Sequence, residues 1–300
     1  EENIDYRNMK KAIHYYTLLE KSKNYSVEAY FKLGFIYSQK IFGVFDLEKA
    51  IEYYSLAIKH NNSQSMFNLG LICIEEEYGI NDLNKAIHYF NLAANRNLAI
   101  AQHKLGNIYS LKEYNVLNIK LAIKFYKLAA NQKYIDSMFE LGFIYSKPEY
   151  GVFDINQSIN YYSQAANLNH VQASYNLGII FYKNEYVPVN LNKAIRYFTI
   201  AAEQHHVESQ FFLGLIYSID QFQLYDINKA IHYFTLAANQ NHIESQECLG
   251  KIYLLNDSVV RDFDKAIYYL SLAANQNSIE SQYQLGKLYI SDKSIYKDVN

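Results

Sequence analysis

Nine histidines and two cysteines are the side chains of this 300-residue chain that are best suited to metal binding or catalysis. Cys73 and Cys248 stand far apart and neither belongs to a CxxC pair, so we expect neither a zinc site nor a disulfide framework. The sequence also lacks a phosphate-binding glycine loop, an HExxH motif, a nucleophile elbow and a calcium-binding loop. We therefore expect no catalytic residue, no metal and no cofactor.

The spacing of the histidines indicates a repeat rather than a metal site. One group of three is spaced by 36 residues and precedes a helical pattern: His170, His206 and His242. A second group occupies another shared position, where other copies carry Glu, Lys, Asn, Arg or Tyr: His14, His88 and His232. We expect the first group at helix starts and the second on a solvated helix face, because such variety is typical of exposed positions.

A 36-residue repeat organises the whole chain. The dipeptide Leu-Gly recurs with its glycine at this interval: Gly34, Gly70, Gly106, Gly142, Gly178, Gly214, Gly250 and Gly286. A small residue before isoleucine keeps the same step after a first interval of 38: Ala12, Ala50, Ala86, Ala122, Ser158, Ala194, Ala230 and Ala266. No linker interrupts the series, and internal repeats of this length are typical of solenoids.

Each repeat contains two helical patterns, which we name helix A and helix B. In helix A, for example residues 208–217, apolar residues surround the glycine at the spacing of one helical face. In helix B, for example residues 229–238, an aromatic residue follows the small residue by three positions in all eight copies. The two patterns predict an all-α fold, an α/α solenoid of antiparallel helix pairs.

Cap and turn residues mark the ends of these helices. Asp or Asn, whose short side chains accept hydrogen bonds from the free N–H groups of a helix start, stands four residues before each small residue: Asn8, Asp46, Asp82, Asn118, Asp154, Asn190, Asp226 and Asp262. After helix B, asparagine stands where a left-handed residue is expected, a conformation that it tolerates well: Asn61, Asn97, Asn169, Asn241 and Asn277.

The glycine inside helix A needs a physical reason. Glycine in a helix costs about 1 kcal/mol relative to alanine, yet every copy carries it. We expect that the missing side chain lets the aromatic residue of helix B lie across helix A.

These landmarks resemble the Sel-1-like repeat, a relative of the tetratricopeptide repeat. That pattern joins A-x-x-x-L-G-x-x-Y to a bend, D-x-x-K-A, an aromatic pair and Ala-Ala. One copy here has these matching residues: Ala173, Leu177-Gly178, Phe181, Asn190, Lys193-Ala194, Tyr197-Phe198 and Ala201-Ala202. The resemblance covers essentially the whole chain. It implies a right-handed superhelix whose relatives serve as scaffolds and adaptors, although Tyr or Phe replaces the family's frequent Trp, and Asn, Lys133 or His205 replaces its Gly after helix B.

We expect residues 1–300 to form a single array of about eight repeats. The pattern starts on a helix B and ends after a helix A, and Asp298 occupies the cap position of a further helix B. Because a solenoid needs polar capping units at both ends, we expect that the array is truncated at both ends and continues beyond them.

Charge and hydropathy restrict the expected partners. The net charge of -2 comes from interspersed acidic and basic residues, whereas nucleic-acid binding needs a basic stripe. No run of 18 apolar residues occurs, so we expect no membrane insertion. Sparse cysteine favours the cytoplasm, and four Asn-x-Ser/Thr sequons leave a luminal or secreted location open: Asn24, Asn61, Asn156 and Asn256.

One apolar feature is not required by the repeat. Three residues before the helix-A glycine and one residue after it, on the face opposite the predicted core, most copies carry apolar or aromatic residues. We name this set the helix-A stripe: Phe31, Phe35, Phe67, Leu71, Phe139, Phe143, Tyr175, Ile179, Phe211 and Leu215. The other copies are mostly polar: His103 with Asn107, Glu247 with Lys251, and Tyr283 with Lys287.

Two interpretations of the stripe stay open. Tetratricopeptide-like arrays line their concave surface with helix A, so an exposed apolar stripe there predicts a groove for a partner segment. The alternative is that these side chains fill the seam between successive A helices. The sequence favours the groove for the position after the glycine and leaves the earlier position undecided. We expect docking across helices A of repeats four to six.

The favoured function is a non-enzymatic protein-interaction scaffold or adaptor that binds a peptide or domain on its concave helix-A face. The first alternative is the non-catalytic repeat arm of a larger signalling enzyme such as a protein kinase. The second is an enzyme in its own right, for which no motif was found. No small-molecule substrate is expected.

Overall fold

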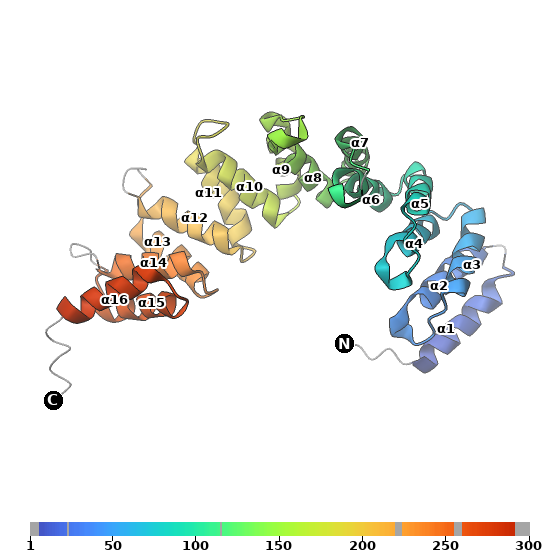
Figure 1. Ribbon diagram of the computed structural model, residues 1–300, viewed down its shortest axis with the longest axis horizontal. Coiled ribbons are helices and arrows are strands. Elements are labelled where there is room, and N and C mark those ends of the chain that lie inside the picture. The colour runs from blue at the N-terminus through green and yellow to red at the C-terminus, as the bar shows by residue number, and fades with distance from the viewer. Residues whose placement is uncertain (1–5, 23, 115, 220–223, 255–259, 292–300) are drawn as a thin grey trace. The chain divides into compact units, whose positions relative to one another are not determined.

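Helices account for all regular secondary structure in the part of the chain that the structure describes. The computed structural model describes residues 6–22, 24–114, 116–219, 224–254 and 260–291, and these ranges contain sixteen α-helices and no strand. The chain forms two compact units, Glu1–Val152 and Phe153–Asn300, each a stack of helix pairs (Figure 1). The predicted all-α fold of paired helices is confirmed. Asp298, the expected further cap, lies outside the described residues.

The N-terminal unit alternates B and A helices, beginning with a helix B. Its α-helices are α1 (Tyr6–Leu19), α2 (Ser26–Ser38), α3 (Leu47–Lys59), α4 (Ser63–Ile74), α5 (Leu83–Asn95), α6 (Ala99–Ser110), α7 (Ile119–Ala130) and α8 (Ile135–Ser146). Short 3₁₀ turns occupy the bends after the A helices: η1 (Lys40–Phe42), η2 (Glu76–Tyr78), η3 (Lys112–Tyr114) and η4 (Pro148–Tyr150).

The C-terminal unit continues the same alternation. Its α-helices are α9 (Ile155–Ala166), α10 (Val171–Tyr182), α11 (Leu191–Ala202), α12 (Val207–Ser218), α13 (Ile227–Ala238), α14 (Ile243–Leu254), α15 (Phe263–Asn275) and α16 (Ile279–Ser291). In both units a helix A packs most extensively on the helix B that follows it, as α4 does on α5 and α12 on α13. The next helix A packs less extensively on that helix B, and successive A helices touch only slightly.

The predicted helix-B caps are confirmed at seven of the eight positions. The Asp46 carboxylate accepts the Lys49 N–H at 3.1 Å, and Asn190 accepts the Lys193 N–H at 3.0 Å. The same arrangement recurs at the other caps: Asp82, Asn118, Asp154, Asp226 and Asp262.

The prediction for Asn8 is wrong. Helix α1 begins at Tyr6, so Asn8 lies inside its first turn. At other caps the backbone N–H of the capping residue donates to a carbonyl of the preceding helix A, as Asp46 does to Tyr37 at 2.9 Å. That bond holds the cap outside the helix. No helix A precedes Asn8 in the described residues, so nothing there stops the helical backbone from extending.

The left-handed turns after helix B are also confirmed. All five predicted asparagines have a positive φ, between 61° and 69°. Lys133 and His205, which replace asparagine at this position, adopt the same conformation, with φ values of 62° and 63°. The repeat geometry therefore imposes the left-handed turn even on residues that favour it less.

The helix-A glycine allows the close approach that the sequence predicted. A Cβ placed on Gly70 would lie 2.5 Å from the Phe90 ring, and one on Gly214 would lie 2.5 Å from the Phe234 ring. These rings belong to the fourth residue after the small residue of helix B, not the third. The third residue instead stacks on helix A, as Tyr53 does on Tyr37 with ring centroids 5.8 Å apart.

We predict opposite effects of alanine at two of these glycines. Gly214→Ala forces the methyl group into the Phe234 ring, and overpacking of this kind costs about 1–3 kcal/mol. Gly286→Ala meets no atom of the described residues within 4 Å and gains up to about 1 kcal/mol of helix propensity. Urea unfolding followed by circular dichroism checks both values. Equal effects of the two substitutions would contradict this packing account.

The aspartate caps predict a pH dependence of stability. The backbone N–H of the lysine three residues later lowers the pKa of Asp46, Asp82, Asp226 and Asp262 below the ordinary 3.8. A depressed native pKa stabilises the fold above the unfolded pKa, and that stabilisation is lost as the pH falls through the native pKa.

We expect a variant with asparagine at these four caps to match the wild type at neutral pH, because Asn and Asp cap about equally well. As the pH falls below about 4, its unfolding midpoint should decline less than that of the wild type. Urea titrations at a series of pH values measure this, and equally steep declines would show that the carboxylates are not coupled to folding.

Candidate functional site

The early positions of the helix-A stripe, three residues before the glycine, pack into the core. Phe67 lies 5.5 Å from Phe90 and Phe211 lies 6.0 Å from Phe234, measured between ring centroids. Phe211 also lies 4.8 Å from the His242 ring at the start of the next helix A. Tyr175 contacts Phe198 and His206 in the same way. Phe31 and Phe139 are half-buried as well. These side chains therefore pack mainly on helix B and on the cap residue of the next helix A.

The positions one residue after the glycine are half-buried like the earlier ones, except for Phe35. Phe35 is 40% exposed, and Leu71, Phe143, Ile179 and Leu215 are half-buried. Phe35 and Leu71 line a pocket of about 230 Å³ between α2 and α4, which we name the α2–α4 pocket. Its full lining is Phe35, Ser38, Gln39, Tyr54, Asn68, Leu71, Ile72, Glu75, Glu77 and Tyr78.

An equivalent pocket lies five repeats later between α12 and α14. It has a volume of about 220 Å³ and is lined by Ser218, Phe234, Cys248, Lys251 and Ile252. Each of these residues is the repeat equivalent of a residue that lines the α2–α4 pocket. Two junctions between A helices therefore hold a pocket at the same repeat position, with different side chains in each.

The sequence interpretation missed most of these lining residues. It singled out Phe35 and Leu71 but not Ser38, Asn68 or Glu75. A signal was present, because serine recurs four residues after the glycine and the position two residues before it varies from Asn to Glu to Cys. That signal identifies a pocket only when the arrangement of helices α2, α3 and α4 is known.

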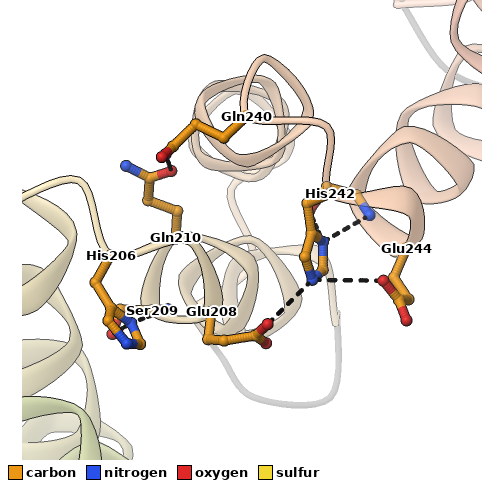
Figure 2. Close-up of polar contacts among 8 residues, drawn as sticks. His206, Glu208, Ser209, Gln210, Gln240, His242 and Glu244 are labelled. Carbon is orange, nitrogen blue, oxygen red and sulfur yellow. Dashed lines mark hydrogen bonds and ion pairs between the residues drawn. The ribbon is translucent and has the colours of Figure 1, made fainter. Parts of the chain in front are cut away.

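The spaced histidines act as helix caps, as predicted. His170 accepts the Ala173 N–H through Nδ1 at 3.1 Å, and His206 and His242 accept the N–H of Ser209 and Ser245 at 3.2 Å. Figure 2 shows His242 between two carboxylates, with Nε2 lying 3.6 Å from Glu208 and 3.4 Å from Glu244. Because the Nδ1 atom of His242 accepts the hydrogen bond from the Ser245 N–H, the neutral form of this ring carries its proton on Nε2.

A chain of glutamine amides crosses the junctions in the first turn of helix A, close to the histidine caps. Gln210 donates to the Ala202 carbonyl at 3.2 Å and accepts from Gln240 at 2.9 Å (Figure 2). Gln246 repeats the arrangement with Ala238 and Gln276, at 3.2 Å and 2.9 Å. Buried amides need such partners, so these contacts serve to hold one repeat to the next.

The described residues contain no group of three or more His, Cys, Asp or Glu side chains placed to hold a metal ion. Burial raises the pKa of the Cys248 thiol to about 11, which disfavours the reactive thiolate. None of the described helices combines the length and the hydropathy that a membrane crossing needs.

Comparison with protein families identifies the repeat. The Sel1 repeat model matches residues 6–19, 27–62, 63–98, 99–134, 135–170, 171–206, 207–242 and 244–278. The chain belongs to the Sel1 repeat family. Sel1 repeats generally serve as protein-interaction scaffolds and are typically non-catalytic.

Solved Sel1-repeat structures share this fold. The protective antigen c5321 of uropathogenic Escherichia coli, which displays the same repeat fold, aligns with 96% of this chain at a TM-score of 0.74 and 22% identity. This chain spans 65% of the length of that protein. A Sel1 repeat protein from Oxalobacter formigenes aligns with 96% of this chain and 83% of its own at a TM-score of 0.67 and 22% identity. Comparison with curated protein sequences gives no match.

A second pH dependence of stability is expected from the cap histidine His206. Burial lowers its pKa from 6.5, and Glu208 only partly offsets this. The native state then binds fewer protons than the unfolded state, so stability falls as the pH drops below about 6.5. His206→Asn should reduce this fall while keeping the cap, since Asn62 caps α4 in the same way at 2.8 Å. If the stability of His206→Asn fell as steeply with pH as that of the wild type, the prediction would be wrong. As the control, the two proteins should be equally stable at about pH 8, where the histidine is neutral in both states.

Proposed function

We propose that this Sel1-repeat chain is a non-enzymatic scaffold that binds a segment of a protein partner along its helix-A faces. The observation that carries the proposal is the recurrent pocket at helix-A junctions. Its repeat position stays constant while its lining changes from Glu75 and Glu77 in one copy to Cys248 and Lys251 in another. A pocket at a constant repeat position, lined by different side chains in different copies, can select different side chains of a partner.

The two halves of the helix-A stripe contribute differently to this function. The early positions, such as Phe67 and Phe211, pack against the core and the next helix start, so they shape the surface. The later positions, such as Phe35 and Leu71, line a pocket and can contact a partner. Partner contact is therefore assigned to Phe35, Leu71, Phe143, Ile179 and Leu215.

The size of the pockets fits side chains of a partner rather than a free small molecule. Sites for drug-sized ligands have volumes of roughly 300–1,000 Å³, whereas the two junction pockets measure about 230 and 220 Å³. Pockets of this size at helix-A junctions match recognition of single side chains of a partner segment.

Serine substitutions test the proposal. We expect Phe35→Ser with Leu71→Ser, and separately Ile179→Ser with Leu215→Ser, to lose a partner captured by the wild-type chain in affinity purification with mass spectrometry. The matched control is Leu128→Ser with Tyr268→Ser, two apolar residues of helices B that are 40% and 58% exposed. Loss of the partner only in the control would overturn the proposal. Urea unfolding verifies that each variant remains folded.

A further inference from the structure

The α2–α4 pocket combines apolar walls with hydrogen-bond acceptors. Phe35, Leu71 and Ile72 supply apolar wall, and Glu75 and Glu77 place two carboxylates in the lining. The face of Phe35 is accessible, since that residue is 40% exposed. A long side chain with an apolar stem and a cationic head would match both parts of this surface.

The polar groups at the base of the pocket leave acceptor capacity unused. Asn68 donates through Nδ2 to the Tyr54 hydroxyl at 2.9 Å, and that hydroxyl lies 3.4 Å from the Ser38 hydroxyl. The donors of Asn68 and Tyr54 are therefore directed within the base, while the Asn68 Oδ1 atom has no partner among the described residues. A ligand group that enters here meets an amide oxygen and carboxylate oxygens, which all accept hydrogen bonds.

Neighbouring lysines offset the charge of the two carboxylates only in part. In the described part of the chain, neither Glu75 nor Glu77 has a cationic nitrogen within 4.0 Å. Lys40 donates to the backbone carbonyl of Glu77 at 2.9 Å instead. Burial raises the pKa of Glu75, with a smaller opposing effect from Lys104 and a further rise from Glu77. The charged form of Glu75 thus lacks full compensation, which an incoming cation would supply.

The equivalent pocket between α12 and α14 has the opposite character. Cys248 replaces Asn68 and Lys251 replaces Leu71 at the equivalent positions, and none of the described residues that line this pocket carries a carboxylate. Glu75 stands at a repeat position where no other copy carries an acidic residue, whereas the position of Glu77 is acidic in other copies as well: Glu113, Glu149 and Glu185.

A second carboxylate of the N-terminal unit also lies partly buried. Glu140 stands at the position of Asn68 two repeats later, is half-buried, and forms no ion pair with the described residues. Burial raises its pKa, and Asp136 raises it further.

We propose that the α2–α4 pocket binds an arginine side chain of the partner segment, an inference that rests on the scaffold function proposed above. The guanidinium carries five N–H donors and stacks on aromatic faces, so it can pair with Glu75 and Glu77 while its plane lies on Phe35. The aliphatic stem lies against Leu71 and Ile72. Lysine offers fewer donors and no planar surface, so it binds less tightly there.

The test uses a library of random peptides displayed on phage and selected on the immobilised full chain. We expect enriched sequences to share one arginine. A synthetic peptide from this set should lose about 10- to 100-fold in affinity when that arginine becomes citrulline, its neutral isostere, because charge-assisted hydrogen bonds are lost. Glu75→Gln with Glu77→Gln should weaken the arginine peptide by a similar factor and have little effect on the citrulline peptide.

Glu76→Gln is the matched control. Glu76 lies in the same 3₁₀ turn and carries the same charge, but it does not line the pocket, so its substitution should change affinity by less than about twofold. If Glu76→Gln weakened the arginine peptide as much as Glu75→Gln with Glu77→Gln does, general electrostatic attraction would account for the binding. That result would overturn the inference.

The selection also separates this inference from the scaffold function. Enriched peptides that lose binding to Phe35→Ser yet carry no shared arginine would overturn the arginine pocket and leave the scaffold function standing. A selection that enriches no peptide would contradict both. Unfolding midpoints of the glutamine variants at or above that of the wild type show that any loss of affinity is not a loss of folding.

Discussion

The contact between the helix-A glycine and a large side chain of helix B is the constraint on which the rest of this structure depends. The rings of Tyr54, Phe90, Tyr126, Phe198 and Phe234 each lie where a Cβ on the facing glycine would have to be. This brings the two helices of a repeat close together and buries the ring almost completely. The surface positions of helix A are fixed as a consequence, because the glycine sets which face of the helix meets its partner.

That constraint also explains why pockets appear where they do. The ring that covers the glycine reaches the next helix A, so that Tyr54 and Phe234 each form part of a junction pocket. Tight packing within a repeat and looser contact between successive A helices leave a space at the junction. The repeat supplies the position of each pocket, and the unconstrained side chains around it supply the chemistry.

Much of the fold could be predicted from the sequence because its determinants are local. A cap such as Asp46 acts on the residue three positions later, and Asn61 adopts its left-handed conformation within one turn. The cap at Asn8 failed because its geometry depends on a preceding helix. The facing ring was placed one residue too early because only packing distinguishes Tyr53 from Tyr54. The pockets could not be predicted, since Ser38, Tyr54 and Asn68 meet only after three helices pack. The single continuous array and its handedness remain predictions.

The central claim is that a partner lies along the helix-A face, and photocrosslinking tests it most directly. A photoreactive phenylalanine analogue placed at Phe35 should crosslink the bound partner, whereas the same analogue at His88, on the exposed face of helix α5, should not. Crosslinking from His88 with none from Phe35 would contradict the account.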